Sequence, residues 1–240
     1  MAKFEASRAV ERRYGLLLRQ VARVVGAMIR AHVDGPTIRD QQKLQRQLEL
    51  YAESLGPWAE KVAADFIESV NRSNKKAWAA NSKRLSVALK NEVANSSVGL
   101  MVRQLQAQQV ALIKSLPIDA GLRAQKLAME AATGGKRADE VAEELMNSEE
   151  VTASRATLIA RTEISRANAA ITQARAEYVG ATHYIWRTAG DGDVRESHRE
   201  MDGKVFQFMA PPTLSDGMTG NPGEFPNCRC FAEPIIPDIE

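Results

Sequence analysis

Apolar residues recur at steps of three and four through most of the first 180 positions, which is the period of amphipathic helices. The first run predicts a helix from Glu5 to about Val33. Further helices are predicted over residues 37–55, 58–79, 82–114, 119–133, 136–147 and 152–179. Glycine and proline interrupt helices, and they mark predicted breaks at Asp34-Gly35-Pro36, Gly56-Pro57, Pro117-Ile118-Asp119, Gly134-Gly135 and Gly180.

Short strands replace helices after Gly180. Residues 182–188 carry the β-branched and aromatic side chains that favour a strand, and Asp202-Gly203 is a favoured tight turn. We also predict a short helix over 194–201, strands over 204–208 and 228–236, and a long loop over 210–227. The predicted fold class is α+β, a mainly α-helical N-terminal region followed by a small α+β module with a short antiparallel sheet. The predicted domains are a helical assembly region over 1–150 and the module over 151–240.

Composition and charge narrow the choice of function. Aromatic residues make up only 5% of the chain, which favours long helices over a β-sandwich. A net charge of +2 is too small for a general nucleic-acid binder. Residues 1–46, however, hold ten Lys and Arg against four Asp and Glu, a net charge of +6. This segment either contacts an anionic partner or forms solvated helix faces.

A series of motifs runs through the last third of the chain. They are Arg161-Thr162-Glu163, Asn168, Trp186, Asp191, Arg195, His198, Met201-Asp202-Gly203, Pro222-Gly223, Asn227-Cys228-Arg229-Cys230 and Pro234. In type and order they resemble the phage Mu F-like minor head protein family, also described as phage head morphogenesis proteins. The resemblance covers about residues 150–236.

This resemblance implies a minor structural protein of a tailed-phage head, present in multiple copies near the portal vertex or in the capsid interior. It implies a role in head morphogenesis and DNA packaging or ejection, with the portal or major capsid protein as partner and no catalysis. Packaged DNA is a further candidate partner for the basic N-terminal region. We expect synthesis in the host cytoplasm and no membrane association, because no apolar run reaches the roughly 20 residues of a membrane span.

Two cysteines and a histidine are the candidate metal ligands. Residues i and i+2 of a strand face the same side, so Cys228 and Cys230 can direct both sulfurs to one point. With His198, and with His183 or Asp191 as fourth donor, they would form a tetrahedral zinc site. The alternative is that both cysteines are small buried apolar residues. We expect no cofactor, with zinc as the alternative.

Two rival functions follow from the same residues. A metal-dependent nuclease or delivered effector would use His198, Cys228 and Cys230, and His198 with Asp191 or Asp202 has the composition of an acid–base pair. No obvious nucleophile accompanies them. The other rival is a scaffold-like protein that leaves the particle before maturation.

We therefore expect the polar motif residues to stabilise the module. Asp191, Arg195 and His198 would hold loops together through charge-assisted hydrogen bonds. Arg161 or Glu163 would reach from the helix to Arg195 or to the backbone near Asn227. Trp186 is expected in the core, because a strand needs a large side chain to bury against an alanine-rich helix.

Overall fold

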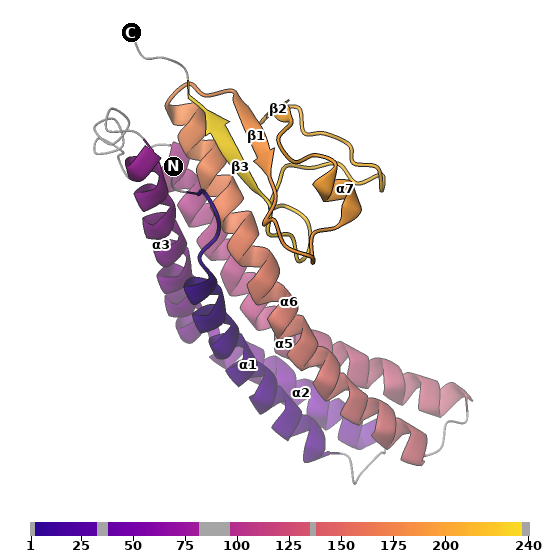
Figure 1. Cartoon of the computed structure of the whole chain (residues 1–240). Helices are drawn as coiled ribbons and strands as arrows, with labels where there is room; N and C mark the ends of the chain where they lie inside the picture. The colour runs from indigo at the N-terminus through magenta and orange to yellow at the C-terminus, as the bar shows by residue number, and fades with distance from the viewer. Residues whose placement is uncertain (1–2, 33–37, 82–96, 135–137, 237–240) are drawn as a thin grey trace. The chain divides into compact units, whose positions relative to one another are not determined.

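The computed structural model describes residues 3–32, 38–81, 97–134 and 138–236 (Figure 1). Most of these residues are helical. The long helices are α1 (Arg8–Arg30), α2 (Ile38–Ser54), α3 (Gly56–Asn81), α5 (Ser97–Gly134) and α6 (Ala138–Tyr178). The predicted breaks at Gly56 and Gly180 are confirmed, since α3 begins at Gly56 and Gly180 takes a positive φ of 77° after the end of α6. Some predictions lie outside the described residues. They are the break at Asp34-Gly35-Pro36, the position of Gly135 and part of the helix over 82–114.

The chain divides into two compact units that are each built from separate segments. Unit 1 comprises Met1–Glu11, Asp65–Gln106 and Arg161–Glu240. Unit 2 comprises Arg12–Ala64 and Ala107–Ala160. Helices α1, α3, α5 and α6 therefore contribute residues to both units. The division of the chain at residue 150 stays a prediction.

Unit 2 is held by an aliphatic core between helices. The side chains that meet there are Val25, Ile29, Leu44, Leu48, Ala120, Ala124, Val141 and Leu145. They come from α1, α2, α5 and α6, as the predicted amphipathic periodicity requires. A buried hydrogen bond adds to this packing, because the Tyr14 hydroxyl donates to Oε1 of Gln109 at 3.0 Å.

The prediction that Pro117 ends a helix is wrong, because α5 continues through it. Proline removes one backbone donor and disfavours the preceding turn. Its neighbours Ile113, Leu116 and Ala120 are buried on the same helix. Burial of these side chains offsets the local cost, so tertiary packing overrides propensity here.

The prediction of separate helices over 136–147 and 152–179 is also wrong, since α6 spans the gap. Thr152 was expected to begin a helix. Its hydroxyl instead donates to the carbonyl of Ser148 at 2.8 Å within α6. Arg123 donates to both side chains, to Oγ of Ser148 at 2.9 Å and to Oγ1 of Thr152 at 2.7 Å. These partners satisfy the polar groups inside a continuous helix.

Unit 1 contains the predicted antiparallel sheet. Among the described residues it has three strands in the order β2-β1-β3, and the α+β fold class is confirmed. The strands are β1 (His183–Arg187), β2 (Val205–Gln207) and β3 (Phe231–Ile235), and the short helix α7 (Glu196–Arg199) lies between β1 and β2 in the chain. The third strand is shorter than predicted, so Cys228 and Cys230 precede it rather than belong to it.

Aromatic side chains fill the core of unit 1. Tyr184 and Trp186 alternate with less buried residues along β1, and both are fully buried. The predicted core position of Trp186 is therefore confirmed. Phe4 joins the same core and packs edge-on against Trp78, with ring centroids 5.2 Å apart. None of the helices in the described ranges is long and apolar enough to cross a bilayer.

The core of unit 2 can be tested with two leucines of α2. Leu48 is 0% exposed and Leu50 is 48% exposed. We expect Leu48→Ala to lower the free energy of unfolding by about 2–5 kcal/mol, because it removes buried methyl groups and leaves a cavity. Leu50→Ala is the control and should change it by less than about 0.5 kcal/mol. Urea denaturation of both variants measures the difference, and equal effects would contradict the packing described.

Candidate functional site

The chain between β1 and β2 positions His198. Gly203 adopts a positive φ of 79° and its N–H donates to the carbonyl of Trp186 at 2.8 Å. Asp202 closes the same turn, because its Oδ1 accepts the N–H of Thr188 at 2.7 Å. These bonds bring α7 back against the sheet, and the predicted role of Asp202-Gly203 as a tight turn agrees with them. His198 on α7 is buried beside Trp186 and Phe225.

A second turn positions the cysteines. The N–H of Cys228 donates to the carbonyl of Phe225 at 3.1 Å, and Asn227 within this turn has a φ of 56°. Asparagine tolerates this left-handed conformation better than most residues. The N–H of Asn227 donates to Oγ1 of Thr162 on α6 at 3.1 Å. The turn therefore fixes the cysteines relative to the helix as well as to the sheet.

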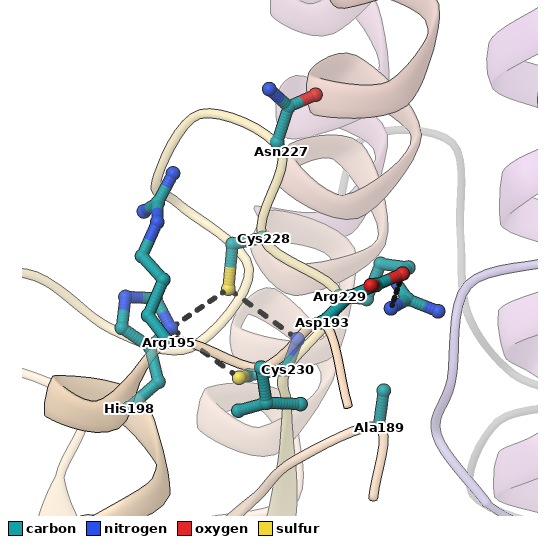
Figure 2. Close-up of a pocket in the computed structure, with 9 residues that line it drawn as sticks. Ala189, Asp193, Arg195, His198, Asn227, Cys228, Arg229 and Cys230 are labelled. Carbon is teal, nitrogen blue, oxygen red and sulfur yellow. Dashed lines mark hydrogen bonds and ion pairs between the residues drawn. The ribbon is translucent and has the colours of Figure 1, made fainter. Parts of the chain in front are cut away.

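The two turns bring three soft donor atoms together (Figure 2). The sulfurs of Cys228 and Cys230 each lie 3.4 Å from Nδ1 of His198, and all three donor atoms lie within 4.8 Å of one another. Cys228 is 4%, Cys230 6% and His198 2% exposed. Both cysteines are free thiols. The predicted association of these residues is thus observed, although a turn rather than a strand produces it.

The thiols differ in their acidity. Hydrogen bonding from Cys230, with a further contribution from His198, lowers the pKa of Cys228 below its usual range. The neighbouring sulfur of Cys228, together with burial, raises the pKa of Cys230. The N–H of Cys230 also donates to Sγ of Cys228 at 3.4 Å. Hydrogen bonds to the sulfur of Cys228 therefore favour its thiolate over that of Cys230.

A small cavity of about 90 Å³ lies against this cluster. Its charged wall is formed by Asp193, Arg195 and Arg229. Such a volume admits a few water molecules, each of which occupies about 30 Å³ in the liquid. It is well below the roughly 300–1,000 Å³ of sites that bind drug-sized ligands.

The proposed fourth metal donors are both engaged elsewhere. His183 begins β1 and pairs with Ile235 at the end of β3. The cysteines precede Phe231 at the start of β3, so His183 lies at the opposite end of the sheet from them. Asp191 accepts two hydrogen bonds from Arg229, at 2.6 and 2.7 Å, and this contact lowers the pKa of Asp191. In the described parts of the chain, the donor cluster consists of His198, Cys228 and Cys230.

Asp191, Arg195 and His198 do hold loops, but each binds its own partner. Asp191 pairs with Arg229, whereas Nη2 of Arg195 donates to the carbonyl of Pro226 at 2.7 Å. His198 faces the cysteines through Nδ1, and its Nε2 has no hydrogen-bond partner in the described structure. His198 therefore does not pair with Asp191, which binds Arg229, or with Asp202, which binds the N–H of Thr188.

Thr162 and Arg166, rather than Arg161, contact the loop from α6. Besides the bond from Asn227 to Thr162, Nε of Arg166 donates to the carbonyl of Glu224 at 2.7 Å. Glu163 is 3% exposed and pairs with Arg166 at 3.2 Å, so it reaches the loop through that arginine. Arg161 lies 3.9 Å from Glu11. Arg166 was not among the residues predicted from the sequence, although its position one helical turn after Thr162 places both on one face.

Gly223 allows the loop to approach α6 closely. It has a φ of 95°, and a Cβ at this position would lie 3.1 Å from the Cβ of Ala169 and 3.1 Å from the carbonyl oxygen of Ser165. A side chain would therefore be disfavoured by both conformation and space. This contact accounts for the glycine of the Pro222-Gly223 motif.

Asn168 belongs to a buried polar layer between α3 and α6. Its Nδ2 donates to the carbonyl of Phe4 at 2.7 Å, and its Oδ1 accepts from Asn74 at 2.9 Å. Asn74 also donates to Thr172 at 2.7 Å and accepts from the buried Arg175 at 2.6 Å. Asn74, Thr172 and Arg175 were not among the residues predicted from the sequence. The signal was present in the spacing of residues 168, 172 and 175, which places polar groups on one face of α6.

Comparisons with known proteins agree with these motifs. Residues 123–233 match the family described as Phage Mu protein F like protein, which confirms the predicted resemblance for this segment. The match begins earlier than residue 150 and includes the end of α5.

The chain is also 34% identical over 203 residues to a protein of Haemophilus influenzae described as an uncharacterized protein. That alignment covers 82% of this chain and 44% of the relative, so the chain spans less than half of the relative's length. No solved structure matches the chain.

The contact between helix and loop can be tested with two arginines of α6. We expect Arg166→Ala to lower the free energy of unfolding by about 1–2 kcal/mol. The substitution removes the hydrogen bond to the carbonyl of Glu224 and the ion pair with the buried Glu163. Arg161→Ala is the control, and loss of its surface ion pair should cost less than about 0.5 kcal/mol. Thermal denaturation of both variants gives the comparison. If Arg161→Ala lowered the stability more than Arg166→Ala, the contact between helix and loop would belong to Arg161, as the sequence predicted.

Proposed function

Since residues 123–233 match the phage Mu F-like family, we propose that the chain is a minor structural protein of a tailed-phage head. In this proposal it acts in head morphogenesis and in DNA packaging or ejection, by binding the portal or the major capsid protein. The family match is the observation that carries the proposal. The contacts of the motif residues support it, because Asp191, Arg195, Asn227 and Gly223 stabilise the loops of the module.

The chemistry of the site favours a structural role over a nuclease. Metal-dependent nucleases usually hold hard cations such as Mg²⁺ with carboxylate oxygens, often in pairs. The cluster here offers two sulfurs and one imidazole nitrogen instead. The adjacent cavity of about 90 Å³ is also smaller than the roughly 300–1,000 Å³ of sites that enclose a small-molecule ligand.

An exposed apolar stripe on α5 supports an interaction with another head protein. Ile118, Leu122 and Met129 are exposed, and steps of four and seven residues place them on one face of the helix. Leu122 is 53% and Met129 63% exposed. Large apolar side chains that line up in this way are typical of protein-binding surfaces.

An arginine stripe on α1 supports contact with packaged DNA. Arg12, Arg19, Arg23 and Arg30 are separated by seven, four and seven residues and so share one face of α1. The buried residues Leu18, Val25 and Ile29 occupy the opposite face. Arg30 also pairs with Glu149. Four of the ten basic residues of segment 1–46 therefore lie along one side of a helix, where they can follow a row of phosphates.

Mass spectrometry of phage particles tests the structural role. We expect the chain in purified mature virions, and we expect Leu122→Lys/Met129→Lys to reduce its incorporation several-fold, because the substitutions add charges to the apolar stripe. Leu50→Lys, on an exposed position of α2, is the control and should be incorporated normally. Circular dichroism confirms that all variants fold. Presence of the chain in immature heads alone would indicate the scaffold-like role instead.

Binding to duplex DNA at several salt concentrations tests the arginine stripe. Each phosphate contact contributes about 0.9 to the slope of log affinity against log salt. We expect Arg12→Gln/Arg19→Gln/Arg23→Gln to reduce the slope by about 2.7. Arg46→Gln, outside the stripe, should leave it close to that of the unmodified protein. An affinity that does not vary with salt would remove DNA from the list of partners.

A further inference from the structure

We propose that Cys228, Cys230 and His198 bind a zinc ion, with the fourth coordination position open to the small cavity beside them. The inference is independent of the role in the phage head, because it uses only the geometry and chemistry of the cluster. It concerns a buried site that connects α7 to the start of β3, two segments about thirty residues apart.

The distances between donor atoms fit tetrahedral coordination. Zinc–sulfur bonds of about 2.3 Å and zinc–nitrogen bonds of about 2.0–2.1 Å imply a sulfur–nitrogen separation of about 3.6 Å and a sulfur–sulfur separation of about 3.8 Å. Both sulfur–nitrogen distances are 3.4 Å, and the sulfurs are no more than 4.8 Å apart. An ion between these atoms therefore requires movements of only a few tenths of an ångström for each sulfur–nitrogen pair.

The orientation of the imidazole separates a metal site from an ordinary hydrogen-bonded cluster. Two sulfurs lie equally close to one nitrogen of His198, whereas one N–H can serve only one of them well. The other nitrogen, Nε2, is buried without a hydrogen-bond partner among the described residues, and the ring packs against Trp186 and Phe225. Zinc would bind Nδ1 in the tautomer with hydrogen on Nε2, and this bond would replace the hydrogen bonds between Nδ1 and the sulfurs.

The donor set selects the metal. Thiolate and imidazole ligands favour zinc over magnesium, calcium or manganese, which prefer oxygen. Zinc also compensates the charge of two buried thiolates, which would otherwise be costly in this environment. The N–H of Cys230 donates to the sulfur of Cys228, as supporting groups commonly do around a metal ligand.

Water is the expected fourth ligand. Open zinc sites have three protein ligands and one water, whereas structural zinc sites usually have four protein ligands. The cavity next to the cluster has room for water, and Arg195 and Asp193 on its wall can hydrogen-bond to it. Zinc would join α7, the turn at Asn227 and β3, and so reinforce a sheet of three short strands.

Metal content and spectroscopy of the full-length protein test this inference. We expect one zinc ion per chain by elemental analysis after purification, and the absorption bands of tetrahedral, thiolate-bound cobalt when Co²⁺ is added to chelator-treated protein. Cys228→Ser, Cys230→Ser and His198→Ala should each lose bound zinc at least tenfold. His183→Ala is the matched control, because this histidine lies at the other end of the sheet, and it should retain zinc.

A stability measurement guards against variants that fail to fold. A chelator should lower the melting temperature of the unmodified protein and leave that of Cys228→Ser/Cys230→Ser unchanged. Folded, unmodified protein that retains no zinc and gives no cobalt–thiolate bands would overturn the inference. Zinc that persists in the double serine variant would overturn it as well, because the ion would then have other ligands.

Discussion

The backbone of the small module has more polar groups than its sheet can satisfy, and the rest of the site follows from this constraint. Three short strands pair only a fraction of the residues that follow α6. The remaining chain runs through turns, and many of its carbonyl and N–H groups have no partner in a strand or helix. Thr162, Arg166 and Arg195 supply partners by binding Asn227, Glu224 and Pro226, respectively. The turns that result place His198 and both cysteines around one point.

Local patterns predicted the elements well where local chemistry decides them. The strand at Trp186, the turn at Gly203 and the helix end at Gly180 were identified because residue type and backbone conformation are closely linked there. The breaks at Pro117 and before Thr152 were wrong because distant groups decide those positions. Burial of the side chains around Pro117 keeps α5 continuous, and the hydrogen bond from Arg123 to Thr152 does the same for α6. Neither the packing nor the arginine can be recognised from the few residues next to the predicted break.

The candidate site shows the same limit. The sequence identified His198, Cys228 and Cys230 as a set, since these residue types share a preference for soft metals. It placed the cysteines in a strand, whereas the left-handed turn at Asn227 brings them together. It also assigned the helix contact to Arg161 instead of Arg166. A motif records which residue types occur in order, but the side of a helix that meets a loop depends on packing along the whole helix.

The bond between Asn168 and the carbonyl of Phe4 joins positions 164 residues apart, and Phe4 also packs on Trp78. When the ribosome has made the first helices, neither Asn168 nor the aromatic residues of the sheet exist yet. The core of unit 1 can therefore close only after most of the chain has been synthesised. Contacts so distant along the chain slow folding, because a large loop must close before they form. The segment around Phe4 is thus made long before Asn168, and it is among the last parts of unit 1 to reach its native place.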